Sequence, residues 1–229
     1  MWKELSRLAW GGILLASLAG APALALGPID GEVGAVWWAN DFDAETGDLD
    51  DSADGDAPGF RGELWFKKYG LRAAMYSSDT DDLNIDQDSS DYMSVDLMWK
   101  AFAPTENNYV AVGLGWEELD ILDSDTSGVR LSAEGRIGIL SVLHAYGHAS
   151  YLPSMDDTSS SGFDGRFEDI DGLEYEVGIS WKMAPFISMR AGYRETSFDF
   201  DFDPLEKSDP EVASSIESTG FLLGLGFHF

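Results

Sequence analysis

The sequence predicts an all-β fold, an antiparallel up-and-down transmembrane β-barrel with ten strands, with eight strands as the alternative. Three observations lead to this fold class. Apolar and polar residues alternate with period two in many segments, and the connections between these segments alternate between long and short. Charged residues also gather on one face of the segments and leave the other face apolar, whereas a soluble barrel would keep its charged face outside.

The alternation is clearest in residues 92–101, 129–137 and 173–182. In the third of these, one face carries Leu173, Tyr175, Val177, Ile179 and Trp181. Seven further segments follow the same rule: residues 31–42, 59–69, 71–78, 107–118, 140–151, 186–198 and 217–229. Each is close to the 9–11 residues that a tilted strand needs to cross a bilayer. An eight-stranded barrel would require two clear segments to be assigned to loops.

The connections predict how the barrel is oriented. Long connections are expected near residues 43–58, 79–91, 119–126, 152–168 and 199–216. Short ones are expected at Gly70 and at residues 103–107, 138–139 and 184–185. Bacterial barrels have short periplasmic turns and long outer loops, so both termini are expected in the periplasm. Alternation over Phe198–Asp203 further predicts that one strand continues above the membrane.

The N-terminus reads as a secretory signal peptide. Lys3 and Arg7 precede an apolar run of about 11–14 residues, which is shorter than a membrane-spanning helix. Small residues then allow cleavage after Ala23 or Ala25. Residues 1–25 are therefore predicted to be a cleaved signal and residues 26–229 to be the barrel, with an uncleaved anchor helix as the alternative. Cysteine is absent from the chain, and a closed, hydrogen-bonded barrel needs no disulfide.

The polar faces of the segments predict a charged lumen. Acidic and basic side chains nearly balance there, so they can pair across the bore. The predicted polar network comprises Arg61, Glu63, Arg72, Asp96, Lys100, Arg130, Glu134, Arg136, His144, His148, Glu174, Glu176, Lys182, Arg190 and Arg194. Glu32, Lys67 and Glu117 share the same polar faces. Ten strands form a narrow cylinder, so such side chains should largely plug it.

The formal charge of −28 is expected mainly in the outer loops. Residues 41–56 contain eight carboxylates and no basic residue. This balance excludes nucleic acid as a partner. A solvated surface that resists self-association explains the charge, and loop-bound Ca²⁺ or Mg²⁺ is the functional alternative. The weak metal candidates are Asp50, Asp54 and Asp56, whose spacing resembles the start of an EF-hand loop, although Arg61 replaces the bidentate glutamate that such a loop requires. No other cofactor is expected.

One pair of residues merits consideration for catalysis. His148 and Ser150 lie two apart on one strand and could act as base and nucleophile near the outer rim. The pair faintly resembles outer-membrane lipid A deacylases, but the surrounding residues do not reproduce that family's pattern. Their parity also turns His148 inward, away from lipid. A place in the polar network with His144 and Tyr146 is preferred, so no catalytic residue is assigned.

The C-terminal segment Phe221–Phe229 resembles the last strand of Gram-negative outer-membrane β-barrel proteins. Residues 184–194 also resemble the turn and penultimate strand of small, poorly characterised porin-like barrels. These resemblances imply a location in the cell outer membrane, contact with its lipid and lipopolysaccharide, and recognition of the strand ending at Phe229 by the barrel-assembly machinery. A structural or small porin-like barrel is the expected function. Loop-mediated binding of divalent cations or of a surface partner comes second, and a rim hydrolase such as a lipid A-modifying enzyme third.

Overall fold

The computed structural model describes residues 29–46, 49–78, 90–105, 107–121, 124–159, 165–204 and 212–229. These residues form ten long strands and one strand of two residues. In chain order they are β1 (Ile29–Thr46), β2 (Leu49–Phe66), β3 (Tyr69–Ser78), β4 (Ser90–Thr105), β5 (Asn108–Ile121), β6 (Ser124–Leu140), β7 (Leu143–Leu152), β8 (Thr158–Ser159), β9 (Gly165–Ala184), β10 (Ile187–Pro204) and β11 (Val212–His228). In this part of the chain, no helix has the length and apolar character to span a bilayer. The predicted signal peptide lies outside the described residues and stays a prediction.

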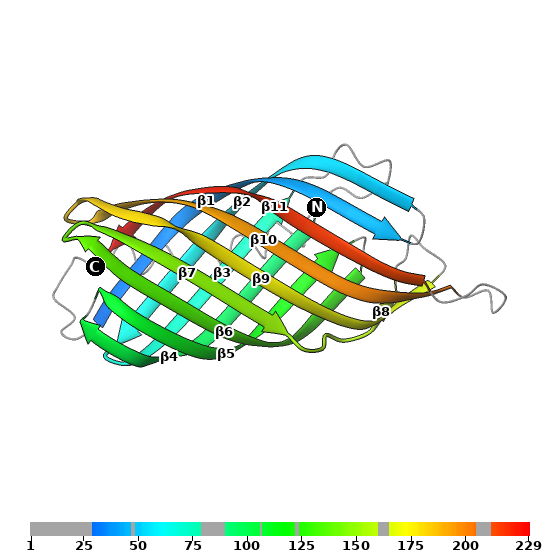
Figure 1. Cartoon of the computed structure of the whole chain (residues 1–229), viewed down its shortest axis with the longest axis horizontal. Helices are drawn as coiled ribbons and strands as arrows, with labels where there is room; N and C mark the ends of the chain where they lie inside the picture. Colours follow the sequence, from blue (N-terminus) through cyan, green and yellow to red (C-terminus); the bar gives the residue numbers. More distant parts are fainter. Residues whose placement is uncertain are drawn as a thin grey trace, which may run out of the picture.

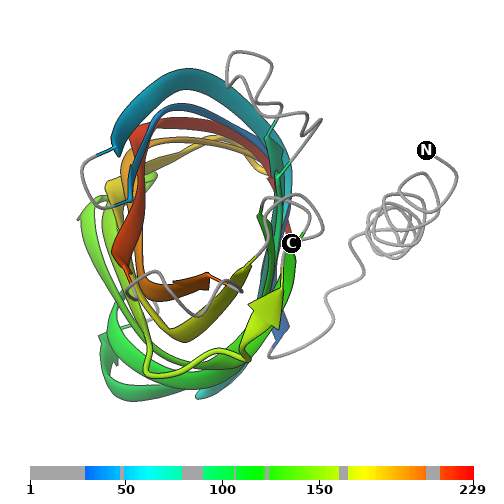
Figure 2. The ribbon, with the colours of Figure 1, turned by 90° about the vertical axis from the view of Figure 1, so that its right-hand side faces the viewer.

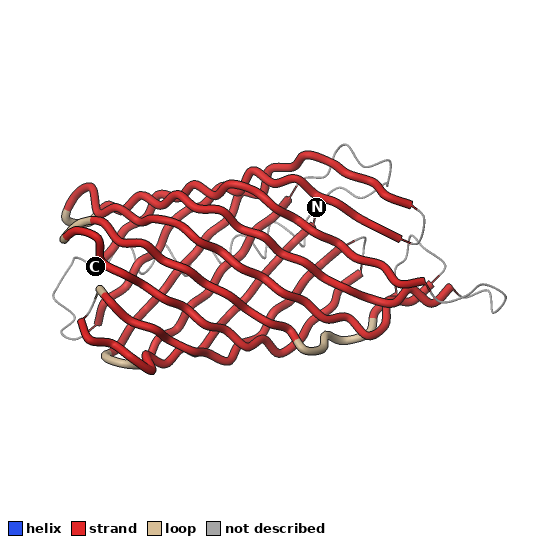
Figure 3. The backbone as a smooth tube through the Cα atoms, in the orientation of Figure 1, coloured by secondary structure: helices blue, strands red, loops and turns tan. Residues whose placement is uncertain are grey.

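The ten long strands close into a barrel (Figures 1 and 2). Each pairs antiparallel with the next long strand in the chain, and β1 pairs with β11 to complete the ring. The strands run obliquely to the long axis (Figure 3). Around the ring the register accumulates an offset of about 12 residues, which for ten strands corresponds to a tilt of about 40°. The ten-strand prediction is therefore confirmed, and the eight-strand alternative is wrong.

Both ends of the described barrel chain lie at one end of the cylinder, which we call the turn end. The tight turns at Lys67–Lys68, Ser141–Val142 and Pro185–Phe186 lie there too. The last residue closes the seam between β11 and β1, because the Phe229 N–H donates to the Gly31 carbonyl at 3.0 Å and the Gly31 N–H donates back at 3.1 Å. The ring of Phe229 covers Gly31, where an added Cβ would lie 2.6 Å from the ring.

At the opposite end of the cylinder, which we call the loop end, the strands extend further than the sequence predicted, and the connections between them are shorter. The long connections expected at 43–58, 119–126 and 199–216 are in large part strand, since β1 continues to Thr46 and β2 begins at Leu49, and the one at 152–168 is strand in part. Beyond the apolar band the outward face of a strand carries polar residues, so the hydrophobic signal fades while the backbone ladder continues. The extension predicted from Phe198–Asp203 is confirmed, because β10 runs to Pro204. Of the connection expected at 79–91, residues 79–89 lie outside the described residues. Ser90 and Asp91 already belong to β4.

The outer surface carries an apolar band of about 25 Å, the height expected of a barrel that faces lipid. On β9 this band runs from Leu173 to Met183, and Val177 near its middle is 53% exposed. Aromatic side chains mark both edges of the band. Those toward the turn end include Phe66, Trp99, Trp181 and Phe227, and those toward the loop end include Trp37, Trp116, Tyr151 and Phe221. Such rings settle at the depth of lipid headgroups.

A β-bulge in β9 changes the alternation at the loop end. Asp169 has φ of 52°, in the left-handed region, and the β9–β10 register shifts beside it. A bulge re-aims the residues that follow it. As a result both Phe167 and Ile170 pack in the same apolar cluster inside the barrel mouth, although they are separated by two residues.

Candidate functional site: the ion-pair network inside the barrel

The charged side chains of the strands lie inside the barrel and are almost completely buried. The basic ones are Arg61, Arg72, Lys100, Arg130, Arg136, Arg190 and Arg194. The acidic ones are Glu63, Asp96, Glu117, Glu134, Glu174 and Glu176, with Glu32 half-buried at the turn end. Lys182 is half-buried at the same mouth, and Lys67 departs from the expected lumen position because it occupies the β2–β3 turn.

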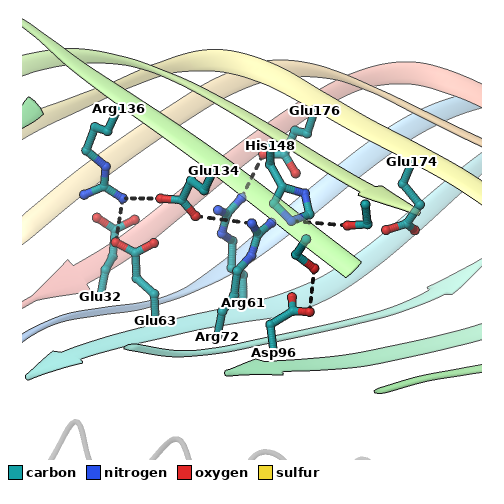
Figure 4. A network of polar contacts seen from close by, with 12 residues as sticks. Glu32, Arg61, Glu63, Arg72, Asp96, Glu134, Arg136, His148, Glu174 and Glu176 are labelled. Atoms are coloured by element: carbon teal, nitrogen blue, oxygen red, sulfur yellow. Dashed lines mark hydrogen bonds and ion pairs between the residues drawn. The ribbon is translucent and has the colours of Figure 1, made fainter. Parts of the chain in front are cut away.

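Ion pairs join strands on different sides of the bore (Figure 4). Arg61 of β2 lies 2.8 Å from Glu176 of β9, and Arg136 of β6 lies 2.6 Å from Glu63 of β2. Arg72 of β3 reaches Glu134 of β6 at 3.3 Å. These pairs connect strands that are not neighbours in the sheet. Their side chains therefore occupy the bore, and their opposite charges neutralise each other.

Arg130 is the most highly connected member of this network. Its guanidinium contacts three carboxylates, Glu117 at 2.5 Å, Asp96 at 3.1 Å and Glu174 at 3.1 Å. It also donates to the hydroxyls of Ser150 and Tyr92. Arg130 is 1% exposed, and each carboxylate is 2% exposed or less, so none of these charges can be solvated from outside. Buried charges of this kind require each other.

Aromatic rings also contact some of the buried cations. The Arg194 guanidinium lies 4.6–5.2 Å from the ring centroids of Tyr76, Tyr92 and Trp38, and it binds Glu174 at 2.9 Å. At the turn end, the Lys100 ammonium lies 4.3 Å from the Trp65 ring and 4.4 Å from the Tyr109 ring. These geometries are cation–π contacts, which are strongest where water is excluded.

The catalytic candidates lie within the network rather than at the outer rim. His148 sits in the middle of β7, between Glu134 of β6 and Glu176 of β9 in the strand register. Its Nε2 is 3.3 Å from the Ser150 hydroxyl, which accepts a hydrogen bond from Arg130. Both residues are buried, at 5% and 2% exposed, so a substrate would have to displace the surrounding ion pairs. His144 is buried nearer the turn end of the same strand.

Two apolar clusters accompany the network inside the barrel. One cluster consists of Val36, Trp38, Ala57, Ala74, Tyr76 and Leu222. A second consists of Leu119, Leu152, Met155, Ile170 and Phe198, with Phe167 and Phe200 against it. Tyr92 packs against both clusters, and we call the two clusters together with Tyr92 the apolar septum.

Sequence alternation missed the septum because its members stand on faces expected to be polar. Tyr92 links the septum to the network. Its hydroxyl lies 3.1 Å from Glu174 and accepts from Arg130 at 2.6 Å. The signal that could have shown this was the run of apolar residues at lumen positions near the loop end, where Leu119, Leu152 and Phe198 stand.

Carboxylates lie on the outer surface just beyond the apolar band, on seven of the ten long strands. Their side chains point outward from Asp41 of β1, Asp56 of β2, Asp91 of β4, Glu118 of β5, Asp171 of β9, Glu195 of β10 and Glu217 of β11. We call this set the carboxylate ring. Burial and the nearby charges of Glu195, Asp43 and Glu45 raise the pKa of Glu217.

The metal candidates do not form a coiled loop. Asp54 and Asp56 point outward from the extended strand β2, and the side chain of Asp50 is outside the described residues. Among the described residues, no group of three or more acidic, histidine or cysteine side chains is close enough to hold an ion. A metal site therefore stays a prediction.

Known structures share this architecture. No protein-family model matches the chain, and no curated protein matches its sequence. The outer-membrane protease OmpT of Escherichia coli matches with a TM-score of 0.58 and 8% identity, covering 92% of this chain and 99% of that one. An outer-membrane channel of Pseudomonas putida matches with a TM-score of 0.45 and 11% identity over 91% of this chain and 98% of that one. The chain therefore has the fold of Gram-negative outer-membrane β-barrels.

Proposed function

We propose that this outer-membrane barrel is a non-enzymatic, structural protein whose lumen is closed, with its termini in the periplasm and its loop end outside the cell. The observation that carries the proposal is the filling of the bore by the ion-pair network together with the apolar septum. The cluster around Trp38 lies beside the network, since its member Ala74 stands opposite Arg61 in the strand register, and the cluster around Phe198 lies nearer the loop end.

The septum and the network oppose conduction for different physical reasons. Packed apolar side chains offer an ion no ligands to replace its hydration shell. The network offers charges, but they are already paired, and breaking one pair leaves an uncompensated buried charge. Barrels with clear aqueous channels use 16 or more strands, so a ten-stranded cylinder lined by long side chains leaves little room.

Conductance measurements test the closed lumen. The refolded protein in a planar bilayer is expected to give no steady openings, with or without millimolar Ca²⁺. A trimeric porin added afterwards to the same membrane serves as the positive control. Steady, ion-selective openings of the wild-type protein would refute the proposal and direct attention to the lumen arginines.

Divalent-cation binding at the outer surface is the second candidate, supported by the carboxylate ring. The ring stands one or two outward positions beyond the outer aromatic edge, at the level of lipid headgroups. Lipopolysaccharide phosphates at that level would repel the ring. Mg²⁺ or Ca²⁺ could bridge the two sets of anions, because both present hard oxygen ligands.

The thermal stability of the barrel in vesicles of defined lipid composition tests this second candidate. In vesicles containing lipopolysaccharide, millimolar Mg²⁺ is expected to raise the temperature at which the folded gel band converts to the unfolded one. The triple variant Asp41→Asn, Glu195→Gln and Glu217→Gln, three members of the ring on adjacent strands, should lose most of this gain. Asp30→Asn, an exposed carboxylate at the turn end, is the control and should keep it. An equal gain in the triple variant would exclude this part of the ring as the binding surface.

A further inference from the structure

The exposed basic residues of the barrel stand in only two places. Among the described residues, the exposed lysines and arginines are Lys67, Lys68 and Arg166, and the others are buried or half-buried inside the barrel. Arg166 lies at the loop end and pairs with Glu168 at 3.3 Å. Lys67 and Lys68 form the two-residue turn between β2 and β3 at the turn end. In a chain of net charge −28, this turn is therefore a local patch of positive potential.

The backbone directs the Lys67 side chain away from the lumen. Alternation along β2 places Glu63 and Trp65 inside, and its continuation would place Lys67 inside as well. Lys67 instead has φ of 58°, in the left-handed region. Its ammonium lies 5.4 Å from the centroid of the Phe66 ring, which is 50% exposed on the outer surface. The Lys67 charge therefore lies on the lipid side of the wall.

The conformation of Lys67 is unusual for its residue type. Two-residue hairpin turns normally place glycine, asparagine or aspartate where φ is positive, because a larger side chain crowds the backbone there. Lysine gives the turn no such conformational advantage. An uncommon backbone conformation at an exposed charged residue points to a use for that charge.

Aromatic side chains surround the turn at the level of lipid headgroups. Tyr69 follows the turn and pairs with Trp99 of β4 in the register, and both rings are exposed outward. The Lys68 carbonyl accepts a hydrogen bond from the Lys100 N–H at 2.8 Å, which ties the turn to β4. Within the described part of the chain, no ion pair involves Lys67 or Lys68. Both ammonium groups are thus available to an anion at a fixed depth in the membrane interface.

We propose that the β2–β3 turn binds the phosphate of an anionic phospholipid in the leaflet at the turn end. Lys67 and Lys68 supply the two ammonium groups, and the rings of Phe66, Tyr69 and Trp99 set their depth. A lipid is favoured over a soluble anion because the Lys67 ammonium lies against a ring on the lipid-facing surface. Binding here does not depend on whether the lumen conducts. Only the identity of the leaflet, the periplasmic one, rests on the proposed orientation.

Quenching of tryptophan fluorescence by brominated lipids tests which lipid lies at the turn. The reporter is Trp99, whose contribution is the difference between the full barrel and its Trp99→Phe variant in vesicles of the same composition. At low salt, brominated phosphatidylglycerol is expected to quench Trp99 more strongly than brominated phosphatidylcholine at equal mole fraction. Molar salt should remove the difference, because it screens exposed charges. Equal quenching by the two lipids at low salt would overturn the proposal.

Variants separate the two lysines from the general charge of the barrel. The double variant Lys67→Gln and Lys68→Gln should reduce the preference for phosphatidylglycerol by about fivefold for each lysine removed. Arg166→Gln, the same change of charge at the loop end, is the matched control and should keep the preference. Heat-modifiable gel mobility shows that each variant is folded. An unchanged preference in the double variant would contradict the assignment.

Lys67→Gly distinguishes the charge from the backbone of the turn. Glycine relieves the left-handed conformation, so this variant should unfold at a higher temperature in phosphatidylcholine while it loses part of the preference for phosphatidylglycerol. Inorganic phosphate and soluble polyglutamate, at matched ionic strength, are expected not to compete with the lipid. Competition by phosphate would indicate a site for the free ion, and competition by polyglutamate would indicate an acidic protein partner. Either result would overturn the assignment to a lipid.

Discussion

Replacing Arg130 by methionine is expected to destabilise the folded barrel by about 3–5 kcal/mol, because removing one partner leaves buried charges uncompensated. Methionine roughly preserves the volume of the side-chain stem. The three carboxylates around Arg130, those of Asp96, Glu117 and Glu174, would keep their positions without their shared cation. The measurement is equilibrium unfolding in urea, followed by tryptophan fluorescence of protein refolded into lipid vesicles.

The matched control is an arginine whose ion pair is exposed. Arg166 lies 3.3 Å from Glu168, and its side chain is 52% exposed. Solvent screens such a pair, so Arg166→Met should change the free energy of unfolding by less than about 1 kcal/mol. Adding Glu117→Gln to Arg130→Met should recover part of the loss by removing one uncompensated charge. Equal urea midpoints for Arg130→Met and Arg166→Met would show that the network contributes no more than a surface pair.

Replacing Val177 by arginine is expected to block stable insertion into lipid, at a cost of about 2–4 kcal/mol near the bilayer midplane. Val177 is 53% exposed near the middle of the apolar band, and Val95 of β4 is 41% exposed on the same outer surface. Either arginine would have to lie among acyl chains or bend away from them. The measurement is the yield of heat-modifiable, membrane-extracted barrel after expression, compared with the wild-type protein.

Ser197→Arg is the control for the added charge. Ser197 points outward from β10 beyond the apolar band and pairs with Glu217 in the register, so an arginine there meets water and a carboxylate. This variant should insert at wild-type yield. Normal yields for Val177→Arg and Val95→Arg would mean that the outward face does not contact lipid.

The barrel itself was predictable because period-two alternation reports directly on which face a side chain occupies. Residues 173–182 illustrate this: Val177 and Ile179 are exposed outward, while Glu174 and Glu176 are buried inside. The full lengths of β1 and β2 were not predictable. The outward side chains of residues 43–58 include Asp43, Glu45, Asp54 and Asp56 instead of apolar residues, so no hydrophobic alternation marks the backbone ladder that the structure shows.

The membership of the network was also predictable, since parity alone assigns Arg130, Glu134 and Glu176 to the interior. Its pairing was not. Arg61 and Glu176 are separated by 115 residues, and only the closure of the ring brings β2 opposite β9. The expected position of His148 and Ser150 near the outer rim failed for a related reason, because depth along the barrel depends on strand tilt and register.

The sequence by itself determined that this chain forms a membrane-facing barrel, which residues face lipid and which charges lie inside. It did so because those properties depend on local alternation and on the cost of placing charge in an apolar medium. Only the tertiary structure decided which side chains meet inside the bore. The apolar septum is assembled from residues on strands far apart in the chain, and Tyr92 packs against both of its clusters. No local pattern encodes such contacts, because the curvature and register of the whole ring bring them together.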